Sequence, residues 1–232
     1  MIDNIPTTQV LWPQAHRIIR SIYPPIDLFE DLADPADWDA LASAEAKTNP
    51  RVMDQIGDLG LVPVERRVGG DGASFLMAPF VHVSIDRPGR FTDGTYGVFS
   101  AGDSEEVAIR EVAYHHARFM KSTEEEPGWT SQFRRLVGSL DANLHDVSDV
   151  PDIREPDDWS VGQDVGRQLR AAGSDGVLYP SVRSPGGNCV GLFWPDVITA
   201  LLTQSSHYDF HYDGKIVDRV RRHDDKQILS LV

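Results

Sequence analysis

The sequence predicts a mixed α+β fold, because stretches with helical periodicity and stretches with strand periodicity occur along the same chain. Helices are expected from Ser104 to about Met120 and from Val161 to Ala172. An apolar and polar alternation from Thr95 to Ala101 predicts a strand just before the first helix. With 232 residues, of which 41% are hydrophobic, the chain can bury one substantial core, and we expect a single domain over residues 1–232.

Further elements follow from turn and cap signals. A helix is expected to begin near Pro35, with Asp34 as its cap. The other expected elements are an apolar run at Phe80–Ile85, strands at Gly176–Tyr179 and Asn188–Phe193 joined through Pro185–Gly187, and an Asp213–Gly214 turn within Tyr208–Val217. The stretches Ser122–Gly128 and Asp149–Asp158 have the proline and charge content of surface loops.

The composition argues against several classes of protein. The 36 acidic and 22 basic residues give a net charge of −14, which disfavours direct binding to nucleic acid. No stretch approaches the roughly 20 apolar residues of a membrane span, and Met1–Pro13 does not resemble a signal peptide, so we expect a cytoplasmic protein. The single cysteine, Cys189, is expected to be a buried thiol, and no metal site is expected.

The helix from Ser104 carries the first candidate for chemistry. Asp103 and Glu106 have the spacing of a reciprocal cap at its start. Glu111 lies in the same helical stripe as Ala108, Val112, His115 and Phe119. Two interpretations follow: Glu111 lies at the edge of the stripe and reaches water, or it is a carboxylate held beside the core for chemistry.

The second helix has its own start and stop signals. Ser160 and Gln163 have the spacing of a capping box, and Gly173 is expected to end the helix in a left-handed conformation. Its expected buried stripe is Val161, Val165, Leu169 and Ala172. The basic cluster Arg219, Arg221, Arg222 and His223 is expected to be a solvated helix or tail surface.

Several short motifs occur in an order that resembles the RES domain, a family named for an arginine, a glutamate and a serine. They are His16-Arg17-Ile18, Thr48-Asn49-Pro50-Arg51, Gly89-Arg90-Phe91, Asp93-Gly94, Tyr96-Gly97, the strand Gly97–Ala101 leading to Glu111, Asp157–Ser160 with Gln163 and Gly166, Asp175-Gly176, Tyr179-Pro180-Ser181, Ser181–Arg183 and Gly186-Gly187. Each motif is weak alone, but the ordered set is specific. The resemblance covers about residues 17–193 and leaves 194–232 as a C-terminal extension.

The resemblance implies a fold, an activity and a partner. RES proteins are similar to the diphtheria-toxin-like ADP-ribosyltransferases, which form a compact α+β domain that binds NAD in a cleft. They act as bacterial toxins that degrade NAD or transfer its ADP-ribose, and an Xre-type antitoxin protein neutralises them. The resemblance thus implies NAD as substrate and an antitoxin partner for this chain, with neither nucleic acid nor membrane as a direct partner.

The chemistry of NAD cleavage explains which residue types such a site needs. Breaking the bond between nicotinamide and ribose develops positive charge on the ribose, and the leaving group is already cationic. A carboxylate is needed to hold the ribose and a cation to hold the diphosphate. Glu111 fits the first role, and Arg17, which matches the family's first arginine, fits the second through bidentate contacts. Arg90, in a turn before the strand, either binds phosphate or shapes the cleft.

Other residues are expected to contact NAD. Arg51 belongs to this set through its motif. Ser160 is explained by its capping box, yet a hydroxyl at a helix start can also bind an anion or ribose. Ser181, in the Tyr-Pro-Ser turn, is the second serine that can touch the nucleotide. Both serines stay candidates for the residue that gives the family its name.

The sequence departs from the family at one position. Related sequences carry a tyrosine eleven residues before the glutamate, where this chain has Ser100. Strand alternation directs Phe99 to the opposite face, whereas Tyr96 shares the face of Ser100 and is a candidate replacement. His115 and His116 are candidates for supporting roles, with His115 expected to be a core histidine.

Three functions are compatible with these residues. The first is a toxin that cleaves NAD as a glycohydrolase or phosphorylase. The second is an ADP-ribosyltransferase that modifies a cellular protein, since NAD binding is common to both and the acceptor depends on loop surfaces. The third is a weakened or inactive RES domain that only binds its antitoxin, for which Ser100 is the supporting feature.

Overall fold

The computed structural model describes residues 4–23, 29, 32–49, 51–199 and 202–232. Pro50 of the motif Thr48–Arg51 lies outside the described residues. The chain contains both helices and strands, with helices in succession between residues 38 and 81 and a final run of strands between residues 203 and 230, which confirms the predicted α+β class. No helix in the described ranges is long and apolar enough to cross a membrane.

The strands of the described chain belong to one sheet. They are β1 (Thr7–Arg20), β2 (Phe99–Gly102), β3 (Thr130–Asp146), β4 (Gly176–Pro180), β5 (Asn188–Leu192), β6 (Thr203–Tyr212), β7 (Val217–Arg222) and β8 (Ile228–Ser230). Their order is β1-β2-β5-β4-β3-β6-β7-β8, and β1 also pairs with β3. The pairings from β1 through β2, β5, β4 and β3 therefore close into a ring, and β6, β7 and β8 extend the sheet beyond β3.

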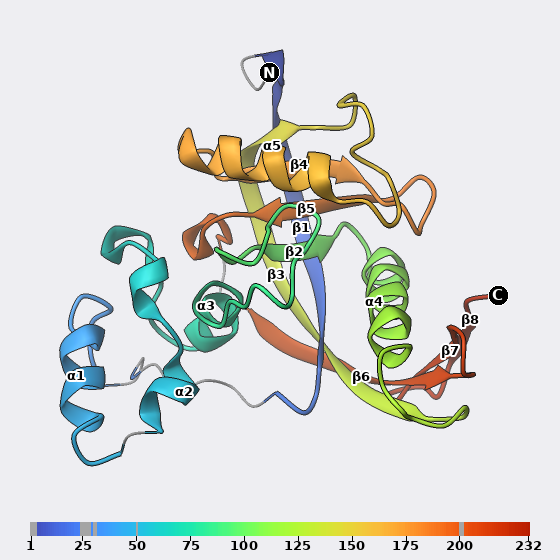
Figure 1. Ribbon diagram of the computed structural model, residues 1–232, viewed down its shortest axis with the longest axis horizontal. Coiled ribbons are helices and arrows are strands. Elements are labelled where there is room, and N and C mark those ends of the chain that lie inside the picture. Colours follow the sequence, from blue (N-terminus) through green and yellow to red (C-terminus); the bar gives the residue numbers. More distant parts are fainter. Residues whose placement is uncertain (1–3, 24–28, 30–31, 50, 200–201) are drawn as a thin grey trace.

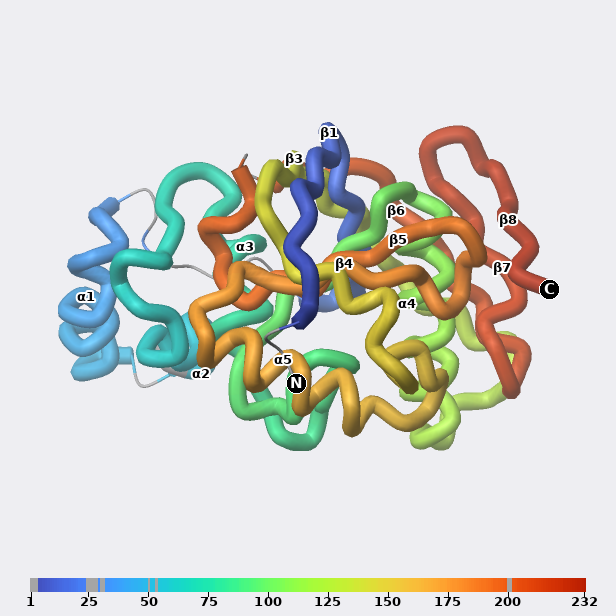
Figure 2. Tube along the Cα trace, turned by 90° about the horizontal axis from the view of Figure 1, so that it is seen from above, coloured from blue at the N-terminus to red at the C-terminus, as the bar shows by residue number. Residues whose placement is uncertain are grey.

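The helices lie around this sheet (Figure 1). They are α1 (Trp38–Glu45), α2 (Val52–Ile56), α3 (Ala73–Val81), α4 (Glu105–Met120) and α5 (Ser160–Ala171), with short 3-10 turns η2 (Leu59–Leu61), η3 (Val64–Arg66) and η4 (Pro195–Val197). Figures 1 and 2 both show α1 and α2 at one end of the molecule and β7, β8 and the C-terminus at the other. Helix α4 lies between the ring and the β6–β8 extension.

The two longest strands, β1 and β3, were not predicted. They pair antiparallel from Thr7 with His145 to Arg20 with Phe133. Local signals in β1 are weak because the register shifts between Trp12 and Ala15, where the chain contains Pro13. Proline cannot donate to the ladder, so it is tolerated at such an irregularity.

Two predicted elements near the N-terminal half are corrected. The helix expected near Pro35 begins at Trp38, and Asp34 accepts a hydrogen bond from the Ala36 amide within the preceding turn. The apolar run Phe80–Ile85 is no separate element, because Phe80 and Val81 end helix α3. The helix start was placed too early because Asp34 and Asp37 both fit a cap signal, and Asp37 is the residue before α1. The run Phe80–Ile85 was misassigned because a short apolar run has no clear period of its own.

The C-terminal elements are close to prediction. Strands β4 and β5 pair antiparallel as expected, and β6 and β7 form a hairpin whose turn includes Asp213. The Asp213 carboxylate accepts hydrogen bonds from the amides of Lys215 and Ile216. The predicted strand Thr95–Ala101 is shorter in the structure, where only Phe99–Gly102 pairs as β2.

The start of α4 differs from the predicted cap. Ser104 is the N-cap, and its side chain accepts from the Val107 amide. Asp103 instead accepts from the Asn188 amide at 2.7 Å and so ties the helix start to β5. Asp103 and Ser104 are adjacent and both are residue types that cap helices, so the sequence does not distinguish them. The position of β5 next to Asp103 decides which of the two is the cap.

The buried stripe of α4 is centred one residue away from the predicted stripe. Ala108 is buried as expected, whereas His115 and Phe119 are exposed. The buried residues are Val107, Ala108, Ile109, Ala113, His116, Ala117 and Met120. Three of them are alanines, which lets the helix approach β1, β6 and β7 closely. His116, not His115, is therefore the core histidine.

Helix α5 keeps its predicted span but not its predicted cap. Ser160 is the first helical residue, and its amide donates to the Asp158 carboxylate. The Gln163 side chain donates to the Gly89 carbonyl rather than back to the helix start. Of the predicted stripe, Val165 and Leu169 are buried, whereas Val161 is half-buried and Ala172 is exposed. Gly173 has a φ of 83°, as expected for a left-handed stop.

The C-terminal basic cluster lies on β7 and just beyond it, not on a helix or free tail. Arg221 and His223 both pair with Asp209 on β6, at 2.6 and 2.8 Å. Arg222 pairs with Glu105 at the start of α4. These arginines thus connect strands to each other and to α4, a role that depends on residues distant in the sequence.

The burial of His116 generates a prediction about pH. Desolvation by burial, followed by the positive charge of Arg20, lowers the pKa of His116 to about 4 from 6.5. Because the unfolded chain binds this proton more readily, the folded state loses stability as the pH falls from about 6.5 toward 4. We expect the His116 contribution to cost about 2–3 kcal/mol at pH 4.5 relative to pH 7.5.

The His116→Phe variant should remove that part of the pH dependence. The His116 ring packs against Phe119 and Phe133 and its Nε2 atom has no partner in the described chain, so phenylalanine should be accommodated. Urea unfolding at both pH values measures the difference. An equal loss of stability in the variant and the original protein would contradict the assignment.

Candidate functional site

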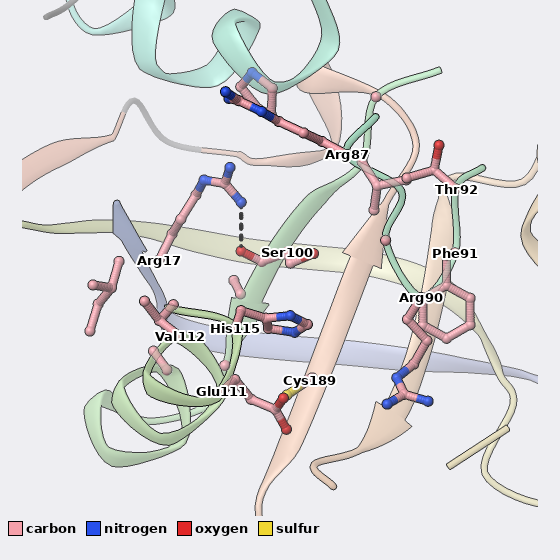
Figure 3. A pocket seen from close by; sticks show the side chains of 18 of the residues that line it. Arg17, Arg87, Arg90, Phe91, Thr92, Ser100, Glu111, Val112, His115 and Cys189 are labelled. Atoms are coloured by element: carbon pink, nitrogen blue, oxygen red, sulfur yellow. Dashed lines mark hydrogen bonds between the residues drawn. The ribbon is translucent and has the colours of Figure 1, made fainter. Parts of the chain in front are cut away.

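A pocket of 370 Å³ opens between the ring of strands and helix α4. Its lining residues come from β1, β2, α4 and the loop between α3 and β2, together with Tyr179 from β4 and Cys189 from β5. Figure 3 shows Arg17, Ser100, His115, Glu111 and Arg90 around this space. The volume lies in the range of small-molecule sites.

Glu111 is the carboxylate of this pocket, and it is held from one side. Its Oε1 atom accepts hydrogen bonds from the Ser181 hydroxyl at 2.6 Å, the Val182 amide at 3.0 Å and the Arg183 amide at 3.3 Å. Its Oε2 atom accepts none from any described residue. The carboxylate is therefore oriented by the turn after β4, and one oxygen stays available to a ligand.

Ser181 supports Glu111 rather than lining the pocket. It is buried, and its hydroxyl also accepts from the amides of Arg183 and Ser184. The hydroxyl thus organises the turn while donating to the carboxylate. Of the two candidate serines, Ser181 is the one that the fold brings to Glu111.

Arg17 lies on β1 with its guanidinium in the pocket. Its Nη1 donates to the Ser100 carbonyl at 3.0 Å, and the guanidinium lies over the Phe99 ring at 4.7 Å. Burial lowers the pKa of Arg17 to about 10, so it is protonated at neutral pH. No carboxylate among the described residues pairs with it. Arg17 is therefore a held cation whose charge is not neutralised by the protein.

The charges of the pocket oppose those of the whole chain. Arg17, Arg87 and Arg90 line it, and Glu111 is the one carboxylate among the lining residues. Arg87 is exposed, has no ion pair in the described chain and extends over the side of the pocket where Arg17 lies (Figure 3). Although the net charge is −14, this cavity favours an anion. Arg87 was not among the predicted site residues, although its place in the turn Arg87-Pro88-Gly89-Arg90 was a signal.

Arg90 is partly committed to structure. Its Nη1 donates to the carbonyls of Ile153 and Glu155, at 2.8 and 2.9 Å, and so fixes the loop before α5. Burial is the largest cause that lowers the pKa of Arg90. Its Nε and Nη2 atoms donate to no described residue, so the side chain both shapes the cleft and keeps donors available.

Ser100, which stands where related sequences have a tyrosine, and Tyr96, its candidate replacement, differ in exposure. Ser100 is exposed on β2 and lines the pocket, as its strand position predicted. Tyr96 also borders the pocket but is buried, and its hydroxyl donates to the Phe91 carbonyl at 2.5 Å. Burial raises the pKa of Tyr96 to about 12. Tyr96 is therefore a packed core residue whose ring is not free to replace a tyrosine at Ser100.

Two sequence candidates lie outside the pocket. Ser160 is exposed at the start of α5, and Arg51 is exposed at the start of α2, and neither lines the cavity. Arg51 was a candidate through its motif, and Ser160 was a candidate through its motif and its place at a helix start. The order of motifs along the chain does not predict on which side of the molecule a residue lies.

His115 and Cys189 contribute differently. The His115 ring is exposed within the pocket, one helical turn beyond Glu111, and lies 5.5 Å from the Trp159 ring. Trp159 was not identified as a neighbour of the site. Burial raises the pKa of the Cys189 thiol, which keeps it neutral, as expected for a buried thiol. Within the described ranges no group of three or more His, Cys, Asp or Glu side chains is placed to hold a metal ion.

Comparisons with known proteins identify similar sequences and folds. The RES domain matches residues 64–213, which include Arg90, Glu111 and Ser181 but begin after Arg17. The uncharacterised protein y4oC of Sinorhizobium fredii is 26% identical over 211 residues, which cover 90% of this chain and 87% of that protein. Among solved structures, a chain of the M. tuberculosis MbcT–MbcA toxin–antitoxin complex aligns over 90% of both chains with 17% identity and a TM-score of 0.47.

The contact between Ser181 and Glu111 yields a prediction. Ser181→Ala should lower the free energy of unfolding by about 1.5–3 kcal/mol, because it removes a hydrogen bond to a charged group. Ser184→Ala is the matched control, since the Ser184 hydroxyl makes no hydrogen bond in the described chain. Urea unfolding of Ser181→Ala, Glu111→Ala and the double variant measures the coupling. Strictly additive losses would contradict a direct interaction.

Proposed function

Because the chain belongs to the RES domain family, we propose that its pocket binds NAD and cleaves the bond between nicotinamide and ribose. The observation that supports this most is the charge arrangement of the pocket. Three arginines line it together with one carboxylate that is oriented by three hydrogen bonds. NAD carries a diphosphate that needs cations and a ribose that needs a carboxylate.

The arginines are proposed to bind the diphosphate. A guanidinium can donate two parallel hydrogen bonds to phosphate oxygens, which fixes orientation as well as charge. Arg17 is suited to this because the Phe99 ring and the Ser100 carbonyl already hold its guanidinium. Less side-chain freedom is then lost on binding. Arg87 and the free donors of Arg90 complete the anion-binding side.

Glu111 is proposed to act at the ribose. Its Oε2 atom would accept from a ribose hydroxyl, and its negative charge would stabilise the positive charge that develops on the ring. Nicotinamide leaves as a neutral molecule with the bonding electron pair, so no acid is required. Water then adds to the ribose carbon and loses a proton, giving ADP-ribose. Ser181 keeps the carboxylate in place without contacting substrate.

Nicotinamide needs a flat neighbour in this scheme. Ser100 offers none, and Tyr96 is buried. The His115 ring is exposed in the pocket beside Glu111 and is proposed to lie against the nicotinamide end of NAD. Desolvation by the surrounding walls of the pocket is the largest cause that lowers the pKa of His115, so the neutral ring would not repel the cationic pyridinium.

We further propose that the protein is the toxin component of a cytoplasmic toxin–antitoxin pair, with an Xre-type antitoxin protein as its partner. This proposal rests on family membership. A neighbouring gene for a small helical DNA-binding protein, whose product suppresses toxicity on co-expression, would support it. Phosphate or a cellular protein can replace water as acceptor, and product identification distinguishes these cases.

Nicotinamide release is the test of the proposed reaction. The purified protein should convert NAD to nicotinamide, measured by chromatography, and Glu111→Gln should lower the rate by roughly 10²-fold or more. Glutamine keeps the shape and removes the charge opposite the developing cation. Glu106→Gln is the matched control, because Glu106 is exposed on the same helix and does not line the pocket.

Two outcomes would overturn the assignment. An unchanged NAD pool after long incubation with added phosphate and cell extract would favour an inactive, antitoxin-binding domain. A normal rate in Glu111→Gln would remove Glu111 from the reaction.

Arg17→Lys is expected to weaken diphosphate binding. Lysine keeps the charge but cannot form two parallel hydrogen bonds or hold its position over Phe99. Calorimetry with ADP, which has the diphosphate but no scissile bond, should show a loss of affinity of roughly tenfold, about 1.4 kcal/mol. The exposed Arg167→Lys should bind ADP normally. Equal affinity of both variants would place the diphosphate elsewhere.

A further inference from the structure

Helix α4 borders a second cavity on its other side. This α4 groove, of 630 Å³, lies between α4, the turn after β4 and the C-terminal strands. Figure 1 shows α4 beside β7, β8 and the C-terminus, and Figure 2 agrees from above. The groove shares no lining residue with the pocket that contains Glu111. A ligand in the groove would therefore leave that pocket open.

The rim of the α4 groove is basic. Arg110, Arg118, Lys121 and Arg183 line it, and Asp157 is its one carboxylate. In a chain with a net charge of −14, such a local excess of cations is unlike the average surface. It favours an anionic ligand.

The protein neutralises these cations incompletely. Lys121 is exposed and has no ion pair among the described residues, and Arg118 is 4.0 Å from an Asp157 oxygen that also accepts from the Tyr114 hydroxyl. Arg183 lies 3.4 Å over the Tyr114 ring and donates to a backbone carbonyl. Only Arg110 has a close carboxylate partner, Glu106. The groove therefore keeps positive charge for a ligand.

The base of the α4 groove is apolar. Ala113 and Ala117 from α4 and Val217 from β7 are buried beneath it, and Leu231 packs at its end. Ile216 at the rim is 40% exposed. Small side chains on α4 let another chain approach the helix closely. The surface is thus apolar at the centre and cationic at its edge, which is the pattern of a protein interface.

The length of the groove indicates what it binds. Arg110 and Lys121 are eleven residues apart on one helix, which corresponds to about 16 Å at 1.5 Å per residue. That distance is too long for one phosphate group, and a free phosphate would gain nothing from the apolar base. A polypeptide with acidic and apolar side chains matches both features.

We propose that the α4 groove is a docking site for an acidic amphipathic segment of a partner protein. The carboxylates of the segment pair with Arg118, Lys121 and Arg183, and its apolar side chains cover Ala113, Ala117 and Ile216. The site is separate from the proposed NAD pocket, and its existence does not depend on NAD cleavage.

A peptide-binding experiment tests this docking site. The probe is a fluorescein-labelled helical peptide of Glu, Leu and Ala, about 14 residues long so that it spans about 20 Å. Fluorescence anisotropy should show saturable binding that weakens with salt and that ADP does not displace. Arg118→Gln combined with Lys121→Gln should reduce affinity at least tenfold, and Ile216→Ser several-fold.

Matched controls separate the groove from general charge effects. Arg154→Gln combined with Arg167→Gln removes two exposed arginines outside both cavities and should leave binding unchanged. Circular dichroism melts verify that each variant is folded. Equal loss in both double variants, equally tight binding of polyglutamate, or displacement by ADP would overturn the proposal. The proposal does not depend on NAD cleavage by these variants, because peptide binding is measured directly.

Discussion

The hydrogen bonds between the Ser181–Arg183 turn and Glu111 Oε1 connect the β4–β5 hairpin to helix α4. The turn belongs to the β4–β5 hairpin, whereas Glu111 is on α4, seventy residues earlier. The same hairpin contacts the helix start, because Asp103 accepts from the Asn188 amide and a side chain at Gly187 would overlap Val107. If the hairpin moved, the carboxylate would lose its orientation. The pocket and the α4 groove both depend on this placement of α4.

Local charge matters more than net charge for the function of this protein. The net charge of −14 disfavours a nucleic-acid backbone as partner, but it does not predict the charge of a cavity that three arginines and one carboxylate line. Fields in a cleft with low-dielectric walls are set by the nearest charges. A chain with an acidic net charge and two basic cavities is therefore compatible with the two anionic ligands that we propose, a nucleotide in one cavity and an acidic polypeptide in the other.

Buried polar groups distinguish binding residues from structural ones. Arg90 and Tyr96 both border the pocket, yet each donates to a backbone carbonyl in a nearby loop. An unpaired buried donor is costly, so such bonds are a sufficient reason for these residue types. Arg17 differs because its guanidinium is held but not neutralised. Because its charge is not neutralised, Arg17 is a stronger candidate than Arg90 for contact with an anion. The two arginines differ in their surroundings and not in residue type.

The sequence by itself determined the α+β class, the approximate spans of α4 and α5, the β4–β5 and β6–β7 hairpins and the place of Glu111 on α4. These features depend on periodicity, caps and turns that act within a few residues. Leu136, Leu140 and Leu144 of strand β3 are buried, but their spacing of four residues fits a helix as well as a strand, and the role of β3 in closing the ring required β1 as a partner. Only the tertiary structure decided that Ser181 rather than Ser160 reaches Glu111, that His116 rather than His115 is buried, and that Arg87 joins the site. Hydrogen bonds and packing between distant segments decide such questions, and no local pattern in the chain records which segments will meet.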